Sequence, residues 1–159
     1  MGRKPARDLG AVDPPRLPES LARWTGNLLW WASRVGARHY ARALEPLGLE
    51  PREVAVLQLL EGEGPYRQGL AADSLGLDRA TMVKVTHSLL GLGLVARSPE
   101  PNDRRALTLS LTAKGEATVA QIAEVTKRAD ETFFGVLSIE ERSALRSALL
   151  RISEAREPR

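Results

Sequence analysis

Apolar residues recur three or four positions apart through the first half of the chain, the spacing of one face of an α-helix. A first long helix is predicted from Pro18 to about Leu44, with an apolar stripe of Leu21, Trp24, Leu28, Trp31 and Val35. A second, short helix carries Val54, Leu57 and Leu60 and ends at the Gly and Pro residues of 62–65. A third helix contains Leu70, Ala71 and Leu75, and it is closed by Gly76.

A fourth helix is predicted to begin after Asp78, because aspartate caps helices by accepting an otherwise unpaired backbone N–H. Its apolar side is formed by Met82, Val85 and Leu89. The opposite side is expected to face outward, with short and basic side chains: Arg79, Ala80, Val83, Lys84 and His87.

After Gly91 and Gly93 the pattern changes from helical to alternating, with leucines at 107, 109 and 111 separated by Thr and Ser. Together with residues 94–100 this predicts a two-stranded hairpin. Helix returns from Thr112 to about Leu137, with a stripe of Val119, Ile122, Ala129, Phe133 and Val136. A capping-box sequence at Ser138 opens the last helix, which carries Leu145, Leu149 and Ile152.

The fold class predicted is therefore mainly α with a small β-hairpin wing. A chain of 159 residues that is 43% apolar suits one domain with a sizeable core. Residues 1–17 are rich in Pro and basic residues without an apolar period, so we expect a flexible N-terminal arm. Residues 46–114 form a winged helix-turn-helix lobe, and residues 18–45 and 115–155 form a helical region outside it.

Composition excludes several classes of protein. Cysteine is absent, so disulfides and thiolate metal sites are ruled out. No apolar stretch approaches the roughly 20 residues that span a bilayer, and no apolar segment follows the basic N-terminus, so no membrane association and a cytoplasmic location are expected. His39 and His87 fall on different predicted helices, and no catalytic motif is present. We therefore expect no metal, no cofactor and no enzymatic activity.

The basic charge is concentrated in the middle of the chain. Residues 67–114 hold seven Lys or Arg and four Asp or Glu, whereas residues 115–159 hold seven and eight. A turn, a capped helix with small and basic outer side chains, and a hairpin with arginines at its tip favour binding in the grooves of DNA. Ala80 and Thr81 would let this helix approach the duplex closely. A solvated helix in a bundle would explain the charges but not the hairpin.

Residues 69–117 closely resemble the winged helix-turn-helix core of the MarR transcriptional regulators. The most specific part is the wing, where the family pattern D-x-R followed by L-T-x-x-G is matched by Asp103, Arg104, Arg105, Leu111, Thr112, Lys114 and Gly115. The order of elements matches over residues 18–155. His87, Leu90 and Leu92 depart from the usual recognition-helix pattern, so the bases read cannot be transferred.

The resemblance implies a homodimer made by the helices at both ends of the chain, bound to a pseudo-palindromic operator as a repressor. It also implies that Arg105 enters the minor groove while Asp103 restrains the loop. The predicted interface residues are Leu21, Trp24, Leu28, Trp31, Phe133, Leu145, Leu149 and Ile152. An alternative function is a protein-interaction module with only non-specific DNA binding.

Trp30 lies off the apolar stripe of the first helix, near Arg23 and Arg34. Two explanations remain open. Trp30 packs against the partner subunit, because aromatic residues are enriched at interfaces, or it lines a pocket for a small aromatic or anionic effector together with Arg34 or Arg38.

Overall fold

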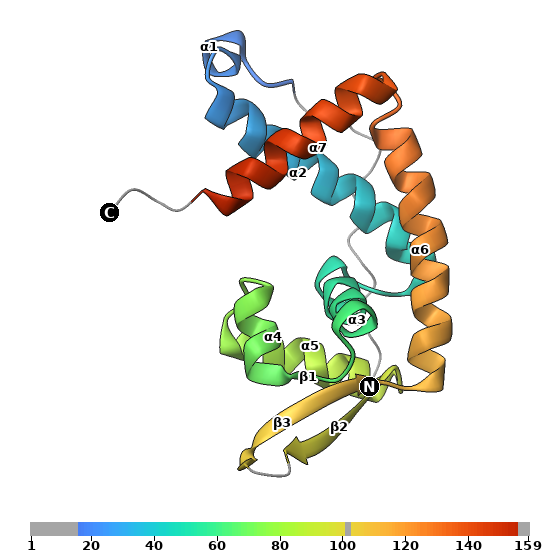
Figure 1. Cartoon of the computed structure of the whole chain (residues 1–159). Helices are drawn as coiled ribbons and strands as arrows, with labels where there is room; N and C mark the ends of the chain where they lie inside the picture. The colour runs from blue at the N-terminus through green and yellow to red at the C-terminus, as the bar shows by residue number, and fades with distance from the viewer. Residues whose placement is uncertain (1–15, 101–102, 156–159) are drawn as a thin grey trace. The chain divides into compact units, whose positions relative to one another are not determined.

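The computed structural model describes residues 16–100 and 103–155, without the side chains of residues 100 and 103–106. Its helices and strands are α1 (Glu19–Ala22), α2 (Thr25–Leu44), a 3-10 turn (Glu45–Leu47), α3 (Pro51–Glu63), β1 (Tyr66–Arg67), α4 (Gln68–Ser74), α5 (Arg79–Gly91), β2 (Val95–Glu100), β3 (Asp103–Leu111), α6 (Ala113–Phe133) and α7 (Ile139–Glu154) (Figure 1). The predicted class, mainly α with a small hairpin wing, is confirmed. The described residues divide into two units after Arg38.

The first long helix is broken where the sequence predicted continuity. α1 ends at Ala22 and α2 begins at Thr25, and the Trp24 N–H bonds to the Leu21 carbonyl in a tight turn. The Asn27 side chain donates to the same carbonyl at 3.1 Å, in competition with helical backbone bonds. Thr25, Gly26 and Asn27 are also weak helix formers, which explains why the apolar stripe alone overestimated the helix.

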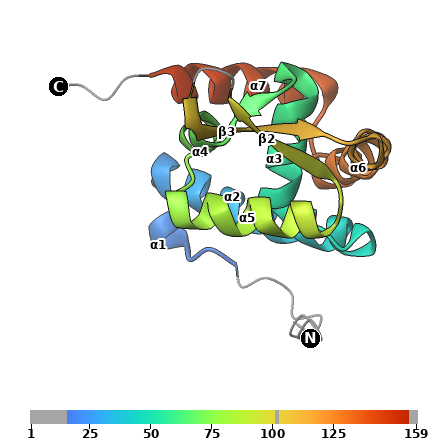
Figure 2. The same ribbon diagram turned by 90° about the horizontal axis from the view of Figure 1, so that it is seen from below.

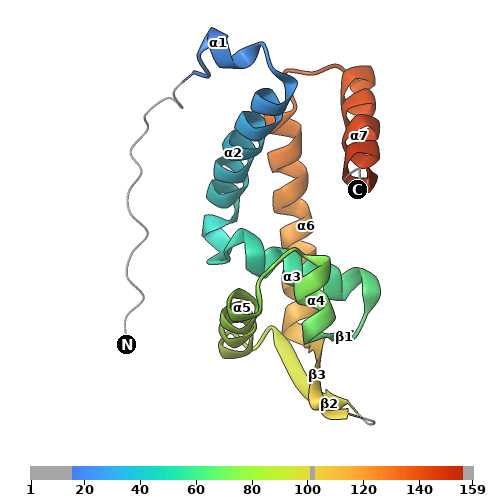
Figure 3. The same ribbon diagram turned by 90° about the vertical axis from the view of Figure 1, so that its left-hand side faces the viewer.

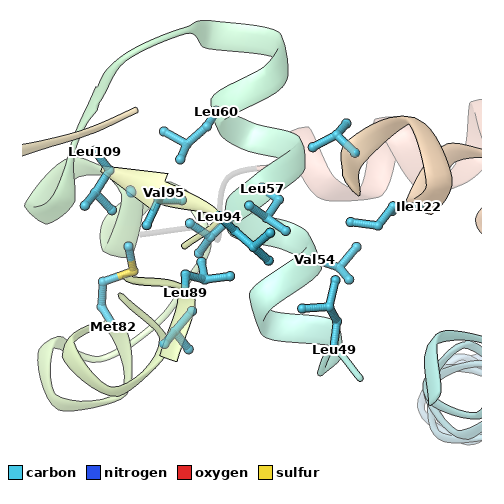
Figure 4. Close-up of a cluster of buried hydrophobic side chains, with 14 of the residues drawn as sticks. Leu49, Val54, Leu57, Leu60, Met82, Leu89, Leu94, Val95, Leu109 and Ile122 are labelled. Carbon is cyan, nitrogen blue, oxygen red and sulfur yellow. The ribbon is translucent and has the colours of Figure 1, made fainter. Parts of the chain in front are cut away.

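The core of residues 39–159 is built around α3. Pro51 starts this helix, and the Glu50 N–H donates to the Glu53 carboxylate at 2.7 Å. Its buried apolar side packs with α5, β3 and α6. Figure 4 shows the side chains that meet there from the helices, the sheet and the segments just before α3 and β2: Leu49, Val54, Leu57, Leu60, Met82, Leu89, Leu94, Val95, Leu109 and Ile122. The predicted apolar stripes of the second and fourth helices are thus confirmed as core.

A third strand joins the predicted hairpin. The antiparallel sheet has the order β1-β3-β2, with Val95 opposite Leu111, Arg97 opposite Leu109, and Tyr66 of β1 also opposite Leu109. Leu109 is fully buried at the centre of the sheet. β1 is only two residues long, which is too short for an alternating pattern to reveal.

The last two helices begin as predicted but α6 ends early. The Thr112 hydroxyl accepts the Gly115 N–H at the start of α6, and the Ser138 capping box opens α7. α6 stops at Phe133, before Gly135, so Val136 lies in the connecting turn and is 87% exposed. The predicted stripe is correct for Val119, Ile122 and Ala129, which are buried, and wrong for Val136. No described helix is long and apolar enough to cross a membrane.

Candidate nucleic-acid interface

The helices α4 and α5 form a helix-turn-helix at the same end of their unit as the β2–β3 hairpin (Figures 1 and 3). Gly76 takes a positive φ of 61° at the turn, where the Leu77 N–H returns to the Ala72 carbonyl at 2.8 Å. This closes α4 in a left-handed cap that glycine adopts without strain. Figure 2 views the lobe from its hairpin end, where α5 runs lengthwise across the view.

The two sides of α5 differ as the pattern predicted. Met82, Val85, Thr86 and Leu89 are buried against the lobe. The residues predicted to contact DNA from this helix lie on the outward side, where Arg79, Ala80, Val83, Lys84 and His87 are exposed and Thr81 is half-buried. The core therefore holds α5 in place, and the outward side of this helix stays free to enter a groove of a DNA duplex.

Asp78 caps α5 through two contacts with Thr81. Its carboxylate accepts the Thr81 N–H at 2.8 Å and the Thr81 hydroxyl at 2.6 Å. These hydrogen bonds, from the side chain first and then the backbone, lower the pKa of Asp78 below its ordinary value. The Thr81 hydroxyl therefore donates its proton to Asp78 of the same chain.

Arg79 ties α5 back to α4. Its guanidinium donates to the Asp73 carboxylate at 3.2 Å and to the Gly69 carbonyl, and the ion pair with Asp73 measures 3.1 Å. Both side chains are well exposed, so this ion pair contributes little to stability. The apolar pattern did not indicate this link, because Asp73 and Gly69 lie six and ten residues away on a separate helix.

The wing residues identified from the family pattern lie at the start of β3. Asp103 is opposite Glu100, and the pairing is irregular between Pro99 and Glu100 at the hairpin tip. The side chains of Asp103, Arg104 and Arg105 lie outside the described residues, so their roles stay predictions. Arg97 of β2 is an exposed basic residue on the same hairpin that the sequence analysis did not single out.

The L-T-x-x-G segment joins α5 and β2 to α6. The Thr112 hydroxyl donates to the Gly93 carbonyl at 2.7 Å, and the Lys114 ammonium donates to the Leu92 carbonyl at 2.8 Å. A Cβ on Gly115 would collide with the Leu94 carbonyl oxygen, so glycine is required for this close approach. These residues fasten the C-terminal end of α5 to the start of α6, a structural role that the sequence alone did not reveal.

The terminal helices expose most of the residues predicted for a dimer interface. Leu21, Trp24 and Leu28 are exposed in α1 and α2 and the segment between them, and Leu145, Leu149 and Ile152 are exposed in α7. None of the residues of α7 is buried. Trp31 is half-buried, and Phe133 packs against His39 and Tyr40 of its own unit, with ring centroids 5.3 and 6.1 Å apart.

The residues predicted for an effector pocket include one close pair. The Arg34 guanidinium lies over the Trp30 ring at 5.2 Å, and Trp30 is 54% exposed. Arg38 is half-buried. A cavity of about 830 Å³ lies elsewhere, and its lining residues come from α3, α6, the turn that follows α6, and α7.

Two polar links on α6 were also missed. The His39 Nε2 bonds to the Ala129 carbonyl at 3.0 Å, and the Tyr40 hydroxyl donates to the Asp130 carboxylate. Burial, and then the bond to Asp130, raise the pKa of Tyr40 well above its ordinary value. These links attach the end of α2 to α6, and no local spacing could have predicted them across ninety residues.

The comparisons with known proteins agree with this geometry. The model of the MarR family matches residues 49–107. A transcriptional regulatory protein for the hcr operon of Thauera aromatica is 32% identical over 116 residues, 72% of this chain and 70% of that protein. The transcriptional repressor CouR, solved with a 23-mer DNA duplex, matches with a TM-score of 0.80 and 30% identity over 88% of this chain and 100% of that one. BpsR of Bordetella bronchiseptica, whose DNA binding is regulated by 6-hydroxynicotinic acid, matches with a TM-score of 0.78 and 26% identity over 87% and 99%.

Proposed function

Because the chain belongs to the MarR family of DNA-binding transcriptional regulators, we propose that it is a repressor that binds a pseudo-palindromic operator as a homodimer. The observation that carries this proposal is the outward side of α5, where Ala80, Val83, Lys84 and His87 are exposed on a helix whose other side is core. A helix of this kind enters the major groove, and its N-terminal residues reach the base edges.

The homodimer is supported by the apolar side chains at both ends of the chain. Large exposed apolar surfaces are rare on soluble monomers and mark interaction sites. α7 has no buried residue, although it carries five leucine or isoleucine side chains, all of them exposed: Ile139, Leu145, Leu149, Leu150 and Ile152. A second copy of the chain would cover them and would set two α5 helices into successive major grooves, about one helical turn of DNA apart.

The wing is proposed to add a minor-groove contact. Arg105 is the residue that matches the family pattern, and a narrow minor groove concentrates the negative potential that attracts a guanidinium. Asp103 would restrain the loop between β2 and β3, and Arg104 would contact the phosphate backbone of the DNA. Repression then follows from occupancy of the operator by the dimer.

A small aromatic anion is proposed to release the DNA. This rests on the relative BpsR and its regulation by 6-hydroxynicotinic acid, and on the aromatic and basic residues Trp30, Arg34 and Arg38 of this chain. Such a ligand acts only through its different affinities for the DNA-bound and released conformations. Adding 6-hydroxynicotinic acid to the complex of the protein with fluorescently labelled operator should release the DNA and lower the anisotropy of the label. An anisotropy that stays unchanged at saturating ligand would contradict this effector class.

The test of the function is a fluorescence-anisotropy titration of the protein against DNA from upstream of its own gene. We expect tight binding to one short pseudo-palindrome, with affinity that falls steeply with salt as condensed counterions are released. A scrambled duplex of the same composition is the control. Equal affinity for the scrambled duplex would contradict the proposal.

A further inference from the structure

Val83 is the apolar residue at the centre of the outward side of α5. It is 57% exposed, and Ala80, Lys84 and His87 beside it are exposed as well. Val83 is β-branched, which lowers its helix propensity slightly, and more than half of the side chain stays in contact with water. On the surface that we propose faces DNA, this apolar side chain is available for a contact outside the chain.

The polar side chains that begin α5 are turned to the protein instead. The Arg79 guanidinium is held by Asp73 and the Gly69 carbonyl, and the Thr81 hydroxyl proton is donated to Asp78. The first part of the helix, which reaches base edges in this type of docking, consequently offers methyl groups from Ala80 and Val83. The next polar side chains along this surface are Lys84 and His87.

Only one base presents an apolar group in the major groove of ordinary DNA, and that group is the C5 methyl of thymine. We propose that Val83 is a specificity-determining residue that packs against a thymine methyl group once in each operator half-site. This rests on the proposed function, because it requires α5 to lie in the major groove. It adds the chemistry of the base that the helix reads.

The proposal is tested by removing single methyl groups from the operator. Each symmetric pair of thymines is replaced by deoxyuridine, which lacks only the C5 methyl, and affinity is measured by anisotropy. We expect one position at which affinity falls about fourfold per half-site, or about fifteenfold for both, as one buried methyl group predicts. At that position 5-methylcytosine should bind more tightly than cytosine, because it restores the methyl group.

Val83→Ala should lose this discrimination, so that thymine and deoxyuridine bind alike at that position. Alanine is the better helix former, so the variant should fold. Val136→Ala is the matched control, since it removes the same atoms from an exposed valine outside α5. It should show the same loss of affinity on deoxyuridine substitution as the parent protein.

A parent protein that binds its operator but tolerates deoxyuridine at every position would overturn the proposal and leave the function standing. The proposal would also be overturned if replacing thymine with deoxyuridine lowers the affinity of Val83→Ala as much as that of the parent protein. Absence of any specific operator would instead overturn the function itself.

Discussion

The helix-turn-helix lobe and the terminal helices differ in where their apolar side chains go. In the lobe, Val56, Leu57, Leu89 and Leu109 are completely covered by other residues of the same chain. In α7 nothing is buried, and along α1 and α2 leucine and tryptophan side chains remain exposed. The lobe is thus stabilised by its own contacts, whereas the terminal helices carry exposed apolar side chains that we propose a second copy of the chain covers.

If the proposed function holds, this contrast lets one short sequence encode both a DNA-reading surface and an assembly surface. The lobe must hold α5 in one orientation without help, so its pattern is satisfied internally. In the proposed homodimer the ends are covered only when two copies meet, so the stability of that dimer should depend on protein concentration.

The largest effect is expected from Leu57→Ala, compared with Leu149→Ala. Leu57 is fully buried, so its truncation should lower the free energy of unfolding by about 2–5 kcal/mol. Leu149 is exposed in the single chain, so its truncation should act through dimer formation. Urea unfolding at low and high protein concentration measures both. The contrast between the two regions is refuted if Leu149→Ala destabilises the protein equally at all concentrations.

Trp30→Ala separates the two explanations of that side chain. Burial of a Trp contributes about 2–3 kcal/mol, and a symmetric dimer loses it twice, so at an interface the variant should dissociate in sedimentation experiments. If Trp30 lines an effector pocket, the variant stays dimeric and binds DNA but no longer responds to an aromatic carboxylate. A variant identical to the parent in assembly, DNA binding and ligand response would exclude both explanations.

Gly115→Ala tests the close approach between the start of α6 and the segment that follows α5. The new Cβ would press on the Leu94 carbonyl oxygen, which is backbone and cannot turn aside, so we expect a destabilisation of roughly 1–3 kcal/mol. Gly91→Ala is the control, because a Cβ there meets no neighbour within 4 Å. Thermal unfolding compares the two. Equal melting temperatures for both variants would show that the space beside Gly115 admits a Cβ atom.

Lys84→Ala should have the smallest effect and should be seen in DNA binding alone. If Lys84 contacts only a phosphate, its loss weakens all sequences alike and flattens the salt dependence of log affinity by about one unit. Titrations of operator and scrambled DNA across salt concentrations measure this. Weaker binding to the operator alone would instead identify Lys84 as a base reader.

The sequence predicted the lobe well because local periodicity and capping residues decide its elements. Asp78 caps α5 as expected, and the leucines of β3 alternate as a half-buried strand requires. Outside the lobe, Ser138 caps α7 as expected. The outward side of α5 followed directly from the position of its apolar residues.

What escaped prediction depends on partners far along the chain or on competing polar bonds. The Asn27 side chain bonds to the Leu21 carbonyl where the first helix breaks. Lys114 donates to a carbonyl twenty-two residues away, and the exposed Arg79 side chain bonds to Asp73 and Gly69 of α4. The apolar pattern does not reveal these contacts, because each is made by a polar group whose partner comes near only when the chain folds.

The most direct test of the account is the stoichiometry of the protein on its operator. Sedimentation equilibrium of the complex with the identified pseudo-palindrome measures how many chains bind one duplex. The account predicts two chains per duplex, with a half-site duplex bound far more weakly, because the terminal helices join two lobes that each read one half-site. A single chain that binds the full operator with the same affinity as its half-site would contradict the division of labour between the lobe and the terminal helices.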